Sequence, residues 1–110
     1  MTRSLRLTRR AQQSLVAIAH WTIARFGQRQ SEIYEAELIE RCEAIVAGQA
    51  HSQSCAILVD DAEDLRFARV GEHFLVFLDT ADEVIIIDIL HARSDLPRHV
   101  AALTAMKRGS

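Results

Sequence analysis

The stretch VIIIDIL, residues 84–90, is apolar at every position except Asp88. Successive side chains of a strand point to opposite faces, so a run that is apolar throughout places apolar groups on both faces. Such a run is typical of an interior strand that is covered on both sides. The polar segment HARSDLPRH, residues 91–99, follows it directly. We therefore expect a buried strand that ends in a polar corner at the edge of the domain.

Other strands are expected around this one. The segments LRFARV (65–70) and HFLVFLD (73–79) are separated only by Gly71 and Glu72, which predicts a hairpin with a tight turn. Near the start of the chain, RSLRLT (3–8) alternates leucines with polar residues and predicts a short strand with one buried face. The segment 49–64 has little regular pattern, and we expect a loop there.

Two amphipathic helices are expected between the first strand and this loop. Thr8 is suited to cap the first helix and Gly27 to end it, while Gly48 ends the second. Their apolar stripes contain Ala11, Leu15, Ile18, Ala19, Thr22 and Phe26 in the first helix, and Tyr34, Leu38, Cys42, Ile45 and Val46 in the second. Helices joined so closely should form an antiparallel hairpin.

A short helix from Pro97 through Met106, capped by Asp95, should close the chain. The order of elements predicts one α+β domain, residues 1–110, with an N-terminal strand, an antiparallel helix hairpin packed on an antiparallel sheet, and a short C-terminal helix.

The composition excludes several classes of function. Thirteen basic against 15 acidic residues give a net charge of −2, which does not favour direct nucleic-acid binding. The start MTRSLRLTRR has no apolar stretch behind it, and no run is long enough to span a membrane, so we expect a cytoplasmic protein. Cys42 and Cys55 have no CxxC spacing and no second ligand pair beside them, so we expect no metal, no disulfide and no cofactor.

Four segments, in this order along the chain, resemble one known family. They are LTRRAQQSLVAIAHWT (7–22), ARFGQRQSEIYEAEL (24–38), DLRFARVGEHFLVF (64–77) and ILHARSDLPRHV (89–100). Together they resemble the ParE-type toxins of bacterial toxin–antitoxin modules, within the RelE/ParE superfamily. The resemblance implies a helix hairpin packed on a sheet and a toxin that inhibits DNA gyrase. It also implies neutralisation by a ParD-type antitoxin, which is a ribbon-helix-helix protein.

Two surfaces are candidates for these partners. Pro97 fixes the turn after the last strand, so the polar side chains there stand on a rigid corner that can grip a target. The candidates for target binding are Arg69, His91, Arg93, Pro97 and Arg98. An antitoxin helix lying in the groove of the hairpin would need an aromatic anchor, and the candidates for it are Trp21, Arg25 and Tyr34.

Two other functions stay open. A ribosome-dependent mRNA endoribonuclease of the RelE type would use His91 as base or acid, His73 or His99 as its titrating partner, and Arg66, Arg69 or Arg93 as a cationic clamp. The other alternative is a non-toxic member of a module that only binds its antitoxin. For His91 itself, the alternative is a structural ring that bonds to a backbone carbonyl or to Asp95.

Overall fold

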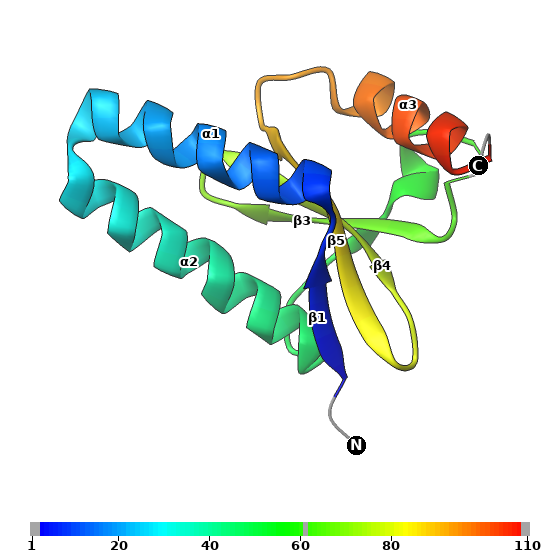
Figure 1. Ribbon diagram of the computed structural model, residues 1–110. Helices are drawn as coiled ribbons and strands as arrows, with labels where there is room; N and C mark the ends of the chain where they lie inside the picture. Colours follow the sequence, from blue (N-terminus) through cyan, green and yellow to red (C-terminus); the bar gives the residue numbers. More distant parts are fainter. Residues whose placement is uncertain (1–2, 61, 109–110) are drawn as a thin grey trace.

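The computed structural model describes residues 3–60 and 62–108, which form three helices, five strands and one short 3-10 helix (Figure 1). In chain order the elements are β1 (Ser4–Leu7), α1 (Arg9–Phe26), α2 (Gln28–Val46), β2 (Gln53–Ser54), η1 (Cys55–Ile57), β3 (Leu65–Val70), β4 (His73–Asp79), β5 (Glu83–His91) and α3 (Leu96–Arg108). The α+β class, the helix hairpin and the closing helix are as the sequence predicts. In the described part of the chain, no helix is long and apolar enough to cross a membrane.

The sheet is mixed, with the strand order β1-β5-β4-β3-β2. The strands β2 to β5 are antiparallel to their neighbours, as expected, but β1 runs parallel to β5, with Leu5 opposite Val84. The prediction of an antiparallel sheet is therefore wrong for β1. Alternation along a strand indicates which face is buried, but it carries no information on the direction of the partner strand.

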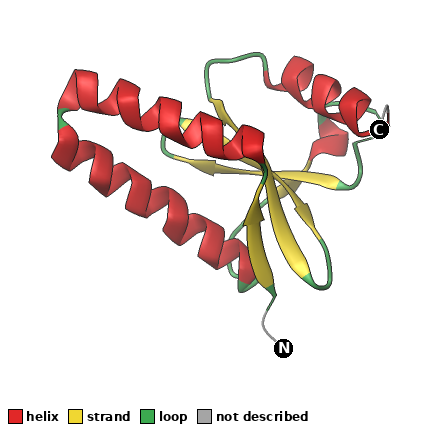
Figure 2. Cartoon of the chain, viewed as in Figure 1, coloured by secondary structure: helices red, strands yellow, loops and turns green. Residues whose placement is uncertain are grey.

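The strand β5 is covered on both faces, which confirms the reading of VIIIDIL. On one face Leu75, Phe77 and Ile86 pack against the helix hairpin, in a cluster that includes Leu38 and Ile45 of α2. The opposite face carries a second cluster, made by Val76 and Leu90 with Leu96, Val100 and Leu103 of α3. Figure 2 shows the hairpin and α3 on opposite sides of the sheet.

The ends of the helices follow the sequence signals. The Thr8 hydroxyl accepts a hydrogen bond from the backbone N–H of Ala11 (3.1 Å) and donates one to the carbonyl of Ile87 in β5 (2.6 Å), so this cap also ties α1 to the sheet. Gly27 (φ +92°) ends α1, and Gly48 (φ +73°) follows the end of α2. The Asp95 carboxylate accepts from the N–H of Arg98 (3.3 Å) at the start of α3.

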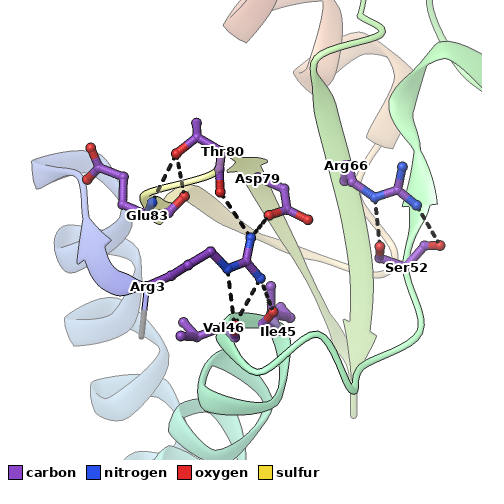
Figure 3. A network of polar contacts seen from close by, with 8 residues as sticks. All are labelled: Arg3, Ile45, Val46, Ser52, Arg66, Asp79, Thr80 and Glu83. Carbon is purple, nitrogen blue, oxygen red and sulfur yellow. Dashed lines mark hydrogen bonds and ion pairs between the residues drawn. The ribbon is translucent and has the colours of Figure 1, made fainter. Parts of the chain in front are cut away.

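The segment 49–64 is more regular than we expected. It contains β2, which pairs with β3 through Gln53 and Ser54, and then η1. Two polar residues carry no alternation, so the sequence offers no signal for this strand. Arg66 of β3 helps to hold the segment, because its guanidinium donates to the hydroxyl (2.8 Å) and the carbonyl (3.0 Å) of Ser52 (Figure 3).

Arg3 joins three parts of the chain just before β1 (Figure 3). Its guanidinium donates to the carbonyls of Ile45 (2.9 Å) and Val46 (2.9 Å) at the C-terminal end of α2. It also pairs with the Asp79 carboxylate and donates to the carbonyl of Thr80 (3.1 Å) at the end of β4. A cation is favourable at the negative end of a helix dipole, so this side chain fixes α2 to the β4–β5 turn.

Candidate functional site

The outer face of the helix hairpin carries an exposed apolar row along α1. Val16 is 56% exposed, Ile23 44% and Phe26 63%. They recur at the spacing i, i+7, i+10, which places them on one side of the helix. Beside this row lies a groove of about 130 Å³ between α1 and α2, where the charged lining residue is Glu35. This surface, which we name the hairpin groove, is suited to an amphipathic helix from a partner.

A second groove, of about 220 Å³, lies on the other side of α1. It is lined by Ala17, Ile18 and Trp21 of α1 together with His73 of β4 and His91 of β5, and we name it the histidine groove. Because Ile18 lines both grooves, the two lie on either side of the same helix. The structure thus brings Trp21, a candidate for antitoxin binding, beside His91, a candidate for target binding.

Trp21 is itself held from two sides. The guanidinium of Arg25 lies 5.1 Å from the centre of its ring, and Phe26 meets the ring edge-on at 5.9 Å. The ring is still 49% exposed. An ordered, half-exposed tryptophan is the kind of side chain that supplies much of the contact energy at protein interfaces.

The histidines of the groove belong to a network that starts at Tyr34. The Tyr34 hydroxyl donates to the carbonyl of Val70 (2.9 Å) and lies 2.6 Å from Nδ1 of His73. His73 and His91 are paired across β4 and β5, and their rings meet at 5.1 Å and 80°. The chain Tyr34–His73–His91 therefore connects α2 to the end of β5.

Burial controls protonation in this network. Burial lowers the pKa of His73, and the neighbouring His91 lowers it further. Burial also raises the pKa of Tyr34, an effect that the backbone N–H of Glu72 partly offsets. Both groups are thus held in their neutral forms at neutral pH.

The polar corner after β5 is organised by His91. Its Nδ1 accepts a hydrogen bond from the backbone N–H of Arg93 (2.9 Å), and its carbonyl accepts from the Ser94 hydroxyl (2.5 Å). The ring is therefore a hydrogen-bond acceptor in the turn. The structural alternative predicted a bond from this ring to a backbone carbonyl or to Asp95, and neither bond is present among the described residues. Arg93, Pro97 and Arg98 are all exposed on this corner.

Arg69 lies apart from the corner residues with which we grouped it. Its guanidinium donates to the carbonyl of Gly71 (2.8 Å) and lies 5.5 Å from the centre of the Phe74 ring. Phe74 packs against the α3 cluster, whereas His91 faces α1, so Arg69 and His91 are on opposite faces of the sheet. The candidates for target binding do not form one surface.

Comparison with known proteins places the chain in a family. Residues 5–96 match the model of the family described as "ParE toxin of type II toxin-antitoxin system, parDE". The chain belongs to the ParE toxin family. A solved structure described as "Chromosomal ParDE TA system from P. aeruginosa" matches with a TM-score of 0.67 and 19% identity, covering 84% of this chain and 98% of that one, which confirms the fold. No curated protein sequence is similar enough to count as a match.

In this ParE-family chain, the described residues contain no group of three or more His, Cys, Asp or Glu side chains placed to hold a metal. Cys42 and Cys55 are buried free thiols, and burial raises the pKa of each to about 11. A thiol with so high a pKa stays protonated at neutral pH and is a poor nucleophile.

Two features of this ParE-family surface are not among the sequence predictions. The sequence predicts His73 only as a catalytic partner in the nuclease alternative, whereas pairing of the strands in register places it opposite His91. Phe26 was predicted to lie in the core stripe of the first helix, but its side chain is exposed at the end of α1. Val16 and Ile23 lie beside that stripe, seven residues apart, and this spacing is a sequence signal for a second apolar face.

Proposed function

We propose that this chain inhibits DNA gyrase by binding it, without catalysing a reaction, and that a ParD-type antitoxin neutralises it in the cytoplasm. Membership of the ParE toxin family supports the proposal, since the matched region covers the hairpin, the sheet and the start of the corner. The observation that carries the antitoxin part is the hairpin groove with its exposed apolar row. An amphipathic antitoxin helix lying in this groove would cover Val16, Ile23 and Phe26.

The geometry favours binding over the RelE-type cleavage of mRNA. Cleavage through the 2′-hydroxyl needs an acid, a base and cations that converge on one phosphate. Here Arg66 is engaged by Ser52, and Arg69 lies on the face of the sheet opposite His91. The rest of the groove that His73 and His91 line is apolar, from Ala17, Ile18 and Trp21, which is a poor setting for a phosphodiester.

The test is a pair of assays with the purified protein. Supercoiling of relaxed plasmid by gyrase should be inhibited, while mRNA added to a translating extract should stay intact. The ParD-type antitoxin that we propose should restore supercoiling when it is added. Cleaved mRNA with unaffected supercoiling would instead establish the nuclease alternative. A chain that binds antitoxin but affects neither assay, and does not slow growth when expressed alone, would be the non-toxic member.

A further inference from the structure

His73 has one ring nitrogen whose partner is absent from the protein. The residue is 7% exposed, and its Nδ1 is engaged by Tyr34. Within the described residues, no fully buried side-chain nitrogen or oxygen lacks a hydrogen-bond partner. The other nitrogen, Nε2, must therefore be reached by solvent, and His73 lines the histidine groove. The groove is thus lined by a buried histidine whose Nε2 is open to solvent.

The hydrogen bonds of Tyr34 fix the proton of His73. The carbonyl of Val70 can only accept, so the single O–H of Tyr34 donates to it (2.9 Å). The 2.6 Å contact between Tyr34 and His73 then requires the Nδ1–H of His73 to donate to the phenolic oxygen. A neutral imidazole has only one N–H, so Nε2 of His73 is a hydrogen-bond acceptor.

The turn after β5 fixes the proton of His91 in the opposite way. Its Nδ1 accepts from the N–H of Arg93 (2.9 Å), so in the neutral ring the proton is on Nε2. This second ring also lines the groove, 5.1 Å from the first. The histidine groove therefore offers one acceptor and one donor side by side, beneath the apolar side chains of Ala17, Ile18 and Trp21.

A primary amide matches this pair, because it brings one acceptor oxygen and two N–H donors in a neutral group. A carboxylate has only acceptors and would need a second proton on the buried His73. An ammonium has only donors and would meet the N–H of His91. A metal ion could take the free nitrogen of His73 but not that of His91, whose Nε2 is protonated as long as Nδ1 accepts from Arg93.

We infer that the histidine groove binds the side-chain amide of an Asn or Gln carried by the antitoxin. This inference rests on the antitoxin part of the proposed function. The antitoxin is the occupant we infer because the groove adjoins the surface proposed for it. Of the residues that the sequence predicts as antitoxin contacts, Trp21 lines the groove, Arg25 stacks on Trp21, and Tyr34 orients His73. A groove of about 220 Å³ accommodates one such side chain, and Ile18 joins it to the hairpin groove.

Two substitutions test the groove without disturbing its frame. His91→Asn keeps an oxygen near the position of Nδ1 to accept from Arg93, but it removes the Nε2–H. Ala17→Glu puts a charged side chain into the groove from the exposed surface of α1. Its matched control is Ala24→Glu, an exposed alanine one heptad further along the same helix that does not line the groove.

Antitoxin affinity is measured by calorimetry, with thermal unfolding of each toxin variant as the check on folding. The expected result is a rise in Kd of about tenfold for His91→Asn, as for the loss of one buried hydrogen bond, and of tenfold or more for Ala17→Glu, with Ala24→Glu within about twofold. Equal losses for the two alanine variants, or an unchanged Kd for His91→Asn, would overturn the inference.

A scan of the antitoxin then identifies the amide. Each Asn and Gln is replaced by Ala and tested against the wild-type toxin and the His91→Asn variant. One of them should cost about tenfold against the wild type and less than about twofold against the variant, which is the sign of a direct pair. If none shows this coupling, the occupant is not an amide. If the wild-type chain binds no antitoxin at all, the proposed function itself has failed. In that case, a neutral His73 protonated on Nε2 in a nitrogen NMR spectrum would also refute the donor and acceptor assignment.

Discussion

Tyr34 packs so closely over Gly71 that a Cβ atom at this glycine would lie 2.8 Å from Cε1 of the tyrosine ring. Gly71 also has a φ of +54°, which other residues adopt only at a cost. The turn between β3 and β4 is thus shaped to receive the side chain that orients His73. The tight turn was predicted from the sequence, but its contact with α2 was not.

Gly71→Ala should therefore destabilise the fold by about 2–4 kcal/mol, since the backbone strain and the contact with Tyr34 both oppose the added methyl group. The matched control is Gly48→Ala, which has a φ of +73° but no atom within 4 Å of the added Cβ. It should cost only about 1–2 kcal/mol, from the backbone alone. Urea unfolding measures both, and equal losses would show that the contact with Tyr34 is unimportant.

His73 should make the stability depend on pH in one direction. Burial and His91 lower its pKa in the folded state, so the unfolded chain takes up this proton at a higher pH than the folded chain does. The contribution of neutral His73 is complete above about pH 6.5, and it is lost as the pH falls from there through the folded pKa. The groups that face this ring are Tyr34, Glu72 and His91.

The free energy of unfolding of the wild type and of His73→Phe, measured from pH 8 to pH 5, tests this prediction. The wild type should lose stability relative to the variant as the solution becomes acidic. A difference between the two proteins that stays constant over this range would show that His73 takes up its proton equally in both states.

Arg3 should matter more for stability than Arg6, its neighbour on the same short segment. The guanidinium of Arg3 holds the end of α2 and the β4–β5 turn, whereas Arg6 makes one exposed ion pair with Glu83 (3.1 Å). Arg3→Met should cost about 2 kcal/mol, because partly buried carbonyls lose a charged donor. Arg6→Met should cost less than about 1 kcal/mol. Chemical denaturation decides, and similar values for both would contradict this role of Arg3.

The exposed row on α1 should carry antitoxin affinity. Ile23→Asp places a charge where an apolar helix face is expected to pack, so antitoxin Kd should rise by about a hundredfold or more, within the range found for central interface residues. The control is Ile33→Asp: Ile33 has a similar exposure, 45%, but lies on α2, outside the exposed row of α1. Binding that depends equally on both residues would place the antitoxin elsewhere.

The polar corner should carry toxicity. Replacing Arg93 and Arg98 together by Glu reverses two exposed charges, and it should abolish growth inhibition while leaving antitoxin affinity within a few-fold. Deleting residues 97–110 should also abolish it, although this removes Val100 and Leu103 from the second core cluster. A folded double variant that binds antitoxin and remains fully toxic would show that the target is gripped elsewhere.

Much of the fold could be predicted from local patterns. Thr8, Gly27 and Gly48 mark the helix ends through backbone chemistry that is written in adjacent residues, and β3 and β4 have the predicted bounds. The parallel direction of β1 could not be predicted, because it depends on how the helices and strands between β1 and β5 are arranged in space. The register shift near Val76 and Phe77 has no sequence signal that we recognise.

The candidate site was harder to predict, because it depends on pairs of elements. Trp21 and His91 are 70 positions apart, and only the packing of α1 on the end of β5 makes them neighbours. Arg69 and His91 are both polar residues near strand ends, but their side chains lie on opposite faces of the sheet. The tautomers of the two histidines depend on hydrogen bonds with Tyr34 and with the backbone of Arg93, which no local sequence pattern predicts.

The pairing of β1 with β5 has a consequence for the newly made chain. Leu5 of β1 is paired with Val84 of β5, so the sheet cannot be complete until β5, the last strand in the chain, has been synthesised. During translation the helix hairpin is complete long before the strands that bury its inner face, and both of its apolar sides are then open to solvent. An antitoxin already present in the cell could meet these helices on the ribosome, before any complete toxin exists.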